Sequence, residues 1–296
     1  MPQRGCHVKL IIISLKIDTF FNGYELCYNS IYMEEKRSGP VLFGIIVDAV
    51  SQATAVKTIH AWMEDGGTQH TIATLNPEFV MEALNDNTFH AILARSSMVL
   101  PDGIGIIIAE RIIYGSSSIS QRVTGIDLLS ALALSCAGHY SHRWYLLGGE
   151  HGAGRSAAQV LSKDVIIAGW NEGLIIRKEG ERIAYDHQVN DRIIQDIRQS
   201  NATIVLVAFG HPKQEKWIEE NRKLLPHVRV FIGVGGSFDF IAGRVKRAPQ
   251  WMRAVGLEWL WRLYMEPYRL PRIITATIHF MREVMRERGN VRKFNQ

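Results

Sequence analysis

Residues 202–236, ATIVLVAFGHPKQEKWIEENRKLLPHVRVFIGVGG, contain the clearest evidence for the fold class. This stretch opens with the apolar run 202–210, continues with a helical pattern over 213–224 and ends with a second apolar run, 228–236. Apolar runs that are continuous rather than alternating are typical of parallel strands buried on both faces. We therefore predict a strand–helix–strand unit that belongs to a parallel sheet.

The same alternation of strands and helices extends upstream from this unit. Further apolar runs fall at residues 41–47, 70–75, 97–100, 143–149 and 164–170. Helical patterns lie at residues 51–63, 104–113, 127–137, 152–161 and 190–199, and Asn76-Pro77 opens another helix. This spacing predicts an α/β fold with a doubly wound, mostly parallel, Rossmann-like sheet. Such folds bind ligands outside the carboxyl ends of their strands.

The composition is that of a globular protein with a sizeable core, because 47% of the 296 residues are apolar and 21% are charged. No run of 18 apolar residues occurs, which argues against a membrane-spanning helix. Cys6, Cys27 and Cys136 form no CxxC pair. We therefore expect neither a disulfide scaffold nor a cysteine-based zinc site, and a reducing compartment. The histidines show no ligand spacing, so the sequence predicts no metal and no cofactor.

The net charge of +5 is unevenly distributed along the chain. Residues 244–296 hold 12 Lys+Arg against 4 Asp+Glu, a net charge of +8, whereas residues 1–243 carry −3. We divide the chain into an atypical, loosely ordered extension (1–39), an α/β domain (40–243) and a basic helical C-terminal appendage (244–296). The extension is alternatively an upstream start before a natural initiator at Met33. An uneven charge of this kind is typical of proteins that contact an anionic membrane or nucleic acid.

The basic appendage also contains aromatic side chains at near-helical spacing. They are Trp251, Trp259, Trp261, Tyr264 and Tyr268, interleaved with arginines. Two interpretations stay open: ordinary helices that pack on the body, or an interfacial anchor with aromatic rings at the lipid headgroups and arginines on anionic lipid. Nucleic acid is disfavoured as a partner, because no recognition module is visible.

Several turns at the ends of the expected strands carry residues that can do chemistry. Asp102 lies in a Pro-Asp-Gly turn, where it serves turn geometry or takes a proton from a substrate hydroxyl. Arg122 is either a solvated loop residue or an anion clamp. Gln214 faces solvent or donates to a bound sugar or phosphate. The glycines of the turn 148–154 either permit a tight turn or present bare amides to a diphosphate.

Taken in chain order, these turns and their surroundings resemble one known family. The motifs are TLNPE (74–78), LPDGIG (100–105), RVTGIDLL (122–129), LLGG (146–149), FGHPKQEKWI (209–218), GVGGSFDFIAGRVKRAP (233–249) and GLEWLWRL (256–263). The chain resembles the WecG/TagA/CpsF glycosyltransferases, glycosyltransferase family 26, from about Val41 to Tyr268. Ordered agreement over seven motifs is far more specific than any one of them.

The resemblance implies a bacterial, inverting, metal-independent enzyme at the inner face of the plasma membrane. It implies transfer of a sugar, often N-acetylmannosamine or a relative, from a UDP-sugar to a polyprenyl-diphosphate-linked sugar in cell-surface polysaccharide synthesis. Asp102 matches the family's proposed catalytic base. The substrate-binding set expected here is Thr74, Asn76, Arg122, Gly148, Gly149, Gln214, Gly236 and Asp239. The set expected at the membrane or acceptor is Arg244, Lys246, Arg247, Arg262 and Arg269.

Some features depart from the family or leave the function open. After the strand 164–170, family members often carry His-Gly-Tyr/Phe, but this chain has Trp170-Asn171-Glu172-Gly173, so the group that contacts uracil is not assigned. The resemblance does not identify the donor sugar, because family members use different sugars, glucose included. The alternatives are a nicotinamide-dependent oxidoreductase and a non-catalytic membrane-binding module. A homo-oligomer is compatible with the sequence.

Overall fold

The centre of the molecule is a six-stranded parallel sheet with the strand order β4-β3-β10-β9-β5-β6. The structure is a computed structural model, and it describes residues 37–137 and 142–294. The strands are β3 (His70–Leu75), β4 (Met98–Pro101), β5 (Arg143–Gly148), β6 (Ile166–Asn171), β9 (Ile204–Ala208) and β10 (Val230–Gly233). The predicted α/β fold class is confirmed.

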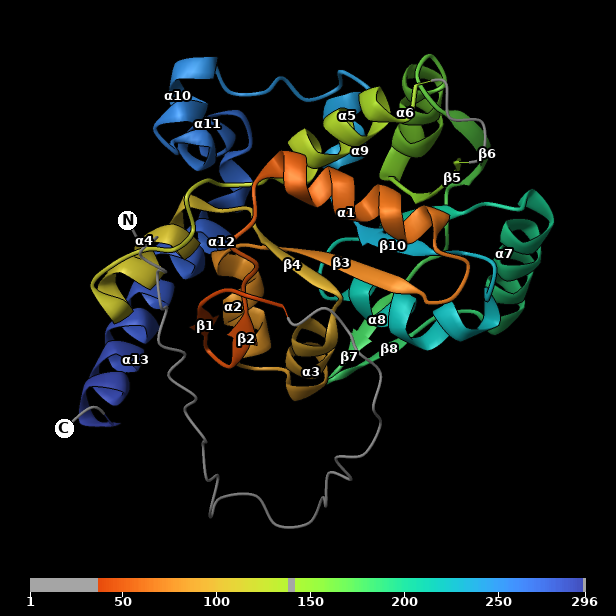
Figure 1. Ribbon diagram of the computed structural model, residues 1–296. Helices are drawn as coiled ribbons and strands as arrows, with labels where there is room; N and C mark the ends of the chain where they lie inside the picture. The colour runs from red at the N-terminus through yellow and green to blue at the C-terminus, as the bar shows by residue number, and fades with distance from the viewer. Residues whose placement is uncertain (1–36, 138–141, 295–296) are drawn as a thin grey trace, which may run out of the picture. The chain divides into compact units, whose positions relative to one another are not determined.

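Helices cover both faces of this sheet (Figure 1). One face carries α1 (Gln52–Glu64), α5 (Gly125–Ser135), α6 (Ala153–Leu161) and α9 (Ser237–Ile241). The other carries α2 (Pro77–Ala83), α3 (Asn87–Arg95), α7 (His187–Ser200) and α8 (Lys213–Asn221). The doubly wound arrangement explains why the strands read as unbroken apolar runs.

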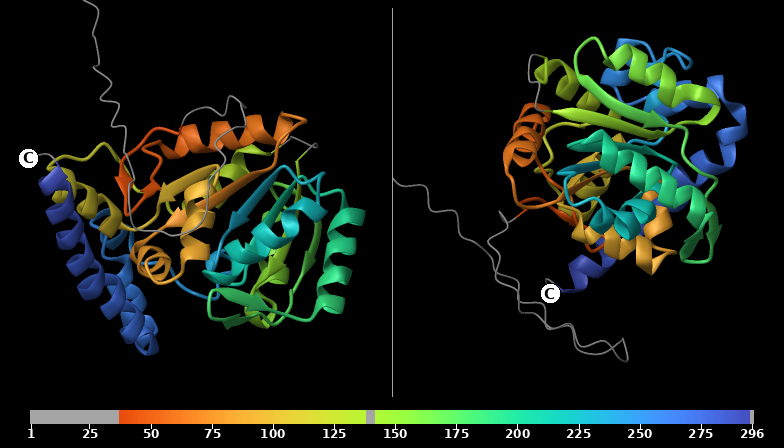
Figure 2. Two further views of the ribbon diagram at one scale, coloured as in Figure 1. Left: turned by 90° about the horizontal axis from the view of Figure 1, so that it is seen from below. Right: turned by 90° about the vertical axis from the view of Figure 1, so that its right-hand side faces the viewer.

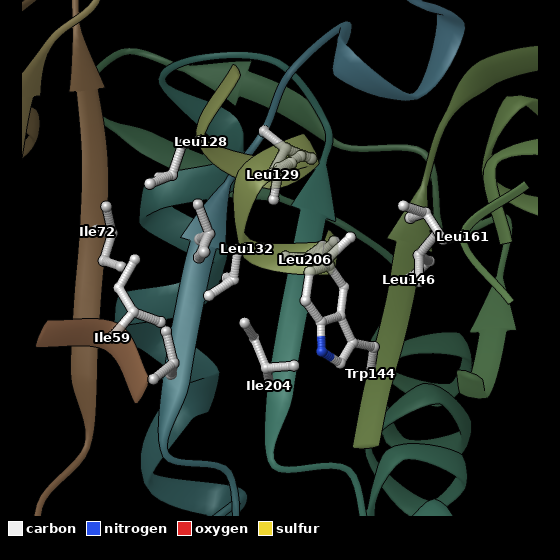
Figure 3. Close-up of a cluster of buried hydrophobic side chains, with 14 of the residues drawn as sticks. Ile59, Ile72, Leu128, Leu129, Leu132, Trp144, Leu146, Leu161, Ile204 and Leu206 are labelled. Atoms are coloured by element: carbon white, nitrogen blue, oxygen red, sulfur yellow. The ribbon is translucent and has the colours of Figure 1, made fainter. Parts of the chain in front are cut away.

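Strand β9 illustrates why every residue of such a strand is apolar. All five of its residues are buried. Ile204 and Leu206 point into the cluster under α1 and α5, where Trp144 of β5 joins them (Figure 3). Val205 and Val207 point into the cluster on the opposite face. Because successive side chains of a strand face opposite sides, a strand in the middle of two helical layers needs an apolar residue at every position.

The run 41–47 does not form the sheet strand that its composition predicts. It folds into a small antiparallel hairpin, β1 (Val41–Leu42) with β2 (Ile45–Ile46). Phe43 and Gly44 have φ values of 53° and 78° and make the turn between them. A second hairpin, β7 (Arg177–Glu179) with β8 (Arg182–Ala184), follows β6.

The C-terminal part of the chain is helical, as expected. It contains α10 (Gln250–Ala254), α11 (Glu258–Met265), η3 (Pro267–Arg269), α12 (Leu270–Ile274), η4 (Thr275–His279) and α13 (Phe280–Phe294). Helix α13 lies beside α4 (Ile104–Tyr114), as Figure 2 shows. Phe280 and Val284 are 1% and 0% exposed, and the Phe280 ring lies 6.0 Å from that of Phe43. In the described ranges, no helix combines the length and apolarity that a bilayer span requires.

Residues 37–296 group into one compact unit. Residues 1–36 of the extension predicted over 1–39 lie outside the described ranges, and Arg37 pairs with the buried Asp48 at 2.9 Å. The proposed division at 243/244 and the membrane role of residues 244–296 stay predictions.

Candidate active site

The polar and glycine-rich turns at the ends of the strands lie at one edge of the sheet. Asn76 follows β3, Asp102 follows β4, and Gly149 follows β5. Gly210 and Gly235 come two residues after β9 and β10. Because all six strands run parallel, these residues share the carboxyl edge, the edge at which open α/β sheets bind their ligands.

Backbone hydrogen bonds fix Asp102 in this edge. Its N–H donates to the Leu75 carbonyl at 2.8 Å, and the Val123 N–H donates to the Pro101 carbonyl at 2.9 Å, which brings Arg122 close. Burial raises the pKa of the Asp102 carboxyl from 3.8 to about 7, against the pull of the Arg122 guanidinium. A carboxyl with a pKa near neutrality can exchange a proton at physiological pH.

A chain of alternating charges reaches from the body into the C-terminal helices beside Asp102. Arg122 pairs with Glu258 of α11 at 3.4 Å. Glu258 also pairs with Arg247 at 3.5 Å, and Arg247 pairs with Asp127 at 2.5 Å. The Glu258 and Asp127 carboxylates both add to the rise in the Asp102 pKa. The C-terminal segment is therefore part of the electrostatic environment of the site.

Arg262 of α11 faces two turns of the carboxyl edge, the one after β4 and the one after β10. Its charge lowers the pKa of Asp102 and also that of Asp239, whose pKa is raised mainly by burial. A Cβ added at Gly236 would lie 3.2 Å from Arg262 Nη2, so this guanidinium touches the turn after β10. It also lies over the Phe240 ring, 5.2 Å from the centroid. One cation from the C-terminal segment thus faces both carboxyls.

Further arginines of the C-terminal segment gather on the same side. Burial lowers the pKa of Arg262, and the charge of Arg269 lowers it further. Arg269 pairs with Glu266 at 2.8 Å, and Arg272 pairs with Glu78, in the first turn of α2, at 2.5 Å. A cation whose pKa is lowered by a neighbouring cation is stabilised by an added anion. The cluster therefore favours an anionic ligand.

Thr74 and Asn76 line the edge at the end of β3. Thr74 is 7% exposed, and both Thr74 and Ser237 would contact a Cβ added at Gly125. Asn76 is the N-cap of α2, because its side-chain oxygen accepts from the Phe79 N–H at 3.1 Å. Thr74 thus lies where three segments meet, while the Asn76 oxygen already has a structural partner.

The local backbone conformation and close packing are sufficient to explain glycine at positions 148 and 149. Their φ values are 93° and 90°. A Cβ on Gly148 would lie 2.7 Å from the Ala208 carbonyl oxygen, and one on Gly149 would lie 2.7 Å from the Gly154 nitrogen. The tight-turn interpretation therefore explains both glycines, and their contact with a diphosphate stays a prediction.

The three basic residues after Gly243 do not act as one group. Arg244 donates to the carbonyls of Glu150 and His151, so it lies over the turn after β5. Arg247 belongs to the charge chain beside Asp102. Lys246 is exposed, and its carbonyl accepts from the Trp261 indole N–H at 3.0 Å. Arg244 and Lys246 are both exposed and form no ion pair within the described residues, whereas Arg247 pairs with Asp127 and Glu258.

Gln214 is buried, which excludes the solvent-facing interpretation. Its side-chain oxygen accepts from the Gly235 N–H at 3.0 Å, and its nitrogen donates to Glu215 Oε1 at 2.7 Å. A Cβ added at Gly233 would lie 2.6 Å from both side chains. Gln214 therefore holds the turn after β10 in place, and Glu215 fixes the orientation of its amide.

Glu215 carries a buried carboxyl whose second oxygen has no hydrogen-bond partner in the described part of the chain. Burial raises its pKa from 4.5 to about 7, and the Gln214 amide opposes the rise. A carboxyl with a raised folded-state pKa stabilises the fold while it is protonated, and this contribution is lost as pH rises through 7. In Glu215→Gln we expect the decline in unfolding free energy between pH 5 and pH 9 to shrink by on the order of 3 kcal/mol.

Urea unfolding at a series of pH values measures this. Asp102 also lowers the unfolding free energy as pH rises, so Asp102→Asn is the matched comparison. The double variant is expected to show the weakest dependence of the unfolding free energy on pH. An unchanged slope in Glu215→Gln would contradict the assignment of this group.

Sequence reasoning missed the acidic members of the site. Asp127 lies in the motif RVTGIDLL, Glu215 in FGHPKQEKWI and Glu258 in GLEWLWRL, so the motifs contain them. No local pattern shows that Glu258 reaches Arg122, because the two are separated by most of the α/β body in sequence. For Glu258, the one signal in the sequence was its position as an acidic residue inside a strongly basic segment.

A desolvated carboxyl among arginines, at the carboxyl edge of a parallel sheet, can exchange a proton next to an anionic ligand. A model of the glycosyl transferase WecG/TagA/CpsF family matches residues 40–293, and the chain belongs to this family. The predicted resemblance is confirmed, and the match extends into α13. The chain is accordingly placed among the glycosyltransferases.

Two curated relatives are similar over most of the chain. One is the N-acetylglucosaminyldiphosphoundecaprenol N-acetyl-beta-D-mannosaminyltransferase of Bacillus subtilis (strain 168), 32% identical over 226 residues, which are 75% of this chain and 82% of the relative. The other carries the same name, comes from Bacillus spizizenii (strain ATCC 23059 / NRRL B-14472 / W23) and is 32% identical over 216 residues, 70% of this chain and 78% of the relative.

Proposed function

We propose that this protein is an inverting glycosyltransferase that moves a sugar from a UDP-sugar to a polyprenyl-diphosphate-linked sugar in bacterial cell-surface polysaccharide synthesis. The observation that carries the proposal is the Asp102 carboxyl, with a pKa of about 7, beside Arg122 and Arg262. A base needs a pKa near the working pH to accept a proton efficiently, and a diphosphate leaving group needs cations. Membership of a glycosyltransferase family weighs against the nicotinamide-dependent alternative.

The proposed reaction is a direct displacement at the anomeric carbon. The acceptor hydroxyl oxygen forms the new bond to that carbon while Asp102 takes the hydroxyl proton. The bond from the anomeric carbon to the UDP oxygen breaks, and UDP leaves with its electron pair. Attack from the face opposite UDP inverts the anomeric configuration. Asp102 is thus the general base.

Arginines are proposed to hold the diphosphate without a metal ion. Arg122, Arg262 and Arg269 surround the edge, and their acidic partners Glu258 and Glu266 belong to the same C-terminal segment. No Asp-x-Asp pair, which often holds the metal ion of a nucleotide-sugar, occurs in the sequence. Guanidinium groups suit phosphate because their paired N–H donors match its geometry.

The names of the relatives point to one donor and one acceptor. Both are described as N-acetylmannosaminyltransferases that act on N-acetylglucosaminyl-diphosphoundecaprenol. We therefore propose UDP-N-acetylmannosamine as the first donor to test, with UDP-glucose and other relatives next. The test is a screen of UDP-sugars against a short-chain lipid-diphosphate acceptor, read by mass spectrometry. Lack of a glycosylated lipid with every donor would overturn the proposal.

The C-terminal segment is proposed to bring the site to the cytoplasmic face of the plasma membrane. Among the described residues, large apolar side chains that are exposed concentrate between Trp251 and Met285. They are Trp251, Val255, Trp259, Leu260, Tyr264, Met265, Tyr268, Leu270, Ile274, Ile278, Met281 and Met285. Arginines on the same helices, such as Arg282 and Arg286, are also exposed. Apolar and cationic side chains on one surface favour an anionic bilayer.

Three of these side chains provide a test of membrane binding. Trp251, Tyr264 and Ile278 are 64%, 75% and 65% exposed, so their replacement by serine leaves the core intact. We expect the triple variant to bind phosphatidylglycerol vesicles about 10- to 100-fold more weakly, because apolar area no longer enters the lipid. Cosedimentation with vesicles measures the change.

The matched control replaces exposed apolar residues elsewhere, Leu84, Val160 and Ile175, with serine. This control is expected to bind vesicles like the unmodified protein. Equal vesicle binding by both triple variants would favour the interpretation that the C-terminal helices only pack on the body.

A further inference from the structure

A cluster of metal-ligating side chains lies at the sheet edge opposite Asp102. His60 of α1, Cys136 directly after α5 and His142 directly before β5 each offer one donor atom, and these atoms lie within 4.8 Å of one another. Cys136 and His142 are 2% and 1% exposed. The six residues of β5 separate this cluster from the carboxyl edge by roughly 20 Å, at about 3.3 Å per residue. It is therefore not part of the proposed active site.

The hydrogen bonds around His60 orient its ring. Ser135 Oγ donates to the Leu132 carbonyl at 2.8 Å, so it accepts from His60 Nε2, which lies 2.7 Å away. His60 Nε2 therefore carries the proton, and Nδ1 carries a lone pair. That Nδ1 faces His142 Nε2 at 3.4 Å. An imidazole oriented by a partner on its other nitrogen is the usual arrangement of a metal-binding histidine.

The separation of the two nitrogens fits a zinc ion between them. With Zn–N bonds of about 2.0–2.1 Å, two ligands of a tetrahedral site lie about 3.3–3.4 Å apart. The Cys136 sulfur lies 4.0 Å from His60 Nε2, on the same imidazole. The three donor atoms lie within 4.8 Å of one another, so a Zn–S bond of about 2.3 Å requires the sulfur and the His60 ring to move toward a shared ion.

The donor types select the metal. One thiolate and two imidazoles are a ligand set typical of Zn²⁺, whereas Mg²⁺ and Ca²⁺ take oxygen ligands. A pocket of about 370 Å³, lined by His60 and Ser135 together with Lys57 and Glu64, opens on the His60 side of the cluster. The sequence does not predict this site, because residues 60, 136 and 142 have no recognisable ligand spacing.

We propose that His60, Cys136 and His142 form a zinc site that joins α1, α5 and β5. On binding, the Cys136 thiol proton leaves to solvent, and His142 keeps one proton on Nδ1. The ion links two helices on one face of the sheet to a central strand, so it stabilises the fold. The inference does not rest on the proposed glycosyltransferase reaction.

Cobalt titration of the full chain, free of a polyhistidine tag and stripped with a chelator, tests the site. We expect one equivalent of Co²⁺ to give a near-ultraviolet thiolate-to-cobalt charge-transfer band and the visible bands of tetrahedral cobalt. Cys136→Ser is expected to abolish the charge-transfer band. A Cys6→Ser/Cys27→Ser double variant and the exposed-histidine variant His187→Gln are expected to retain it. Lack of the band in the unmodified protein, or its survival in Cys136→Ser, would overturn the proposal.

Thermal unfolding gives a second readout. At a Zn²⁺ concentration one hundred times its Kd, we expect the Tm to rise by about 5–10 °C. His60 is partly exposed, so His60→Gln keeps the fold if Cys136→Ser does not, and it is expected to lose most of this rise. A Tm that does not respond to Zn²⁺ in the unmodified protein, or that rises equally in His60→Gln, would overturn the proposal.

Discussion

Asp102→Asn is expected to lower kcat by about 10²–10⁴, the range that general-base help supplies. The amide has nearly the same size as the carboxylate but cannot accept the proton of the acceptor hydroxyl. Because the arginines of the edge remain, the Kd for UDP is expected to change little. Steady-state turnover with a lipid-diphosphate acceptor and calorimetric titration with UDP measure the two effects separately.

Asp65→Asn, at the exposed end of α1, is the matched control and should leave both turnover and the Kd for UDP unchanged. Full turnover by Asp102→Asn would remove this residue from the mechanism. Loss of turnover together with loss of UDP affinity would instead mean that the substitution disturbs the whole edge.

The raised pKa of Asp102 predicts the pH dependence of the reaction. The base must be deprotonated, so kcat/KM is expected to fall as pH decreases below about 7. The Glu258 carboxylate raises this pKa, and the Arg122 guanidinium lowers it. Glu258→Gln removes the repulsion, so the decline in kcat/KM should move to lower pH. If kcat/KM declines at the same pH in Glu258→Gln as in the unmodified protein, Glu258 does not influence the titration of Asp102.

The sequence predicts the sheet well because burial on both faces leaves a local record. Residues 204–208, which form β9, are apolar at every position because the strand lies between two helical layers. The run 41–47 has the same composition but folds into a hairpin, because Phe43 and Gly44 adopt positive φ. Hydrophobic periodicity alone does not distinguish the two outcomes.

The site is predictable to the extent that strand ends define it. Parallel strands bring Asn76 and Asp102 to one edge whatever the loops do. The contacts of the C-terminal segment are different, because they join distant parts of the chain through side chains. A count of charges predicts that this segment is basic, but it does not show that Glu258 pairs with Arg122 or that Arg262 faces two carboxyls.

Arg262→Gln is expected to lower kcat/KM for the UDP-sugar by about 10²–10³, the usual cost of removing one group that stabilises developing charge. Arg262 touches the turn after β10 and acts on both Asp102 and Asp239. We therefore expect it to stabilise the charge that develops on UDP as it leaves. Steady-state kinetics over a range of UDP-sugar concentrations measure the loss, and Arg262→Lys should recover part of it, because charge remains without the paired donors.

A point substitution tests this role better than truncation of the segment. Cutting the chain after Pro249 would also remove Phe280 and Val284, which are buried in the core, so activity would be lost for structural reasons. Arg282→Gln is the matched control, because that side chain is 83% exposed and its charge lies on the same segment. If both arginine variants lose activity equally, the segment acts through its overall charge at the membrane; if only Arg262→Gln does, the guanidinium acts at the diphosphate.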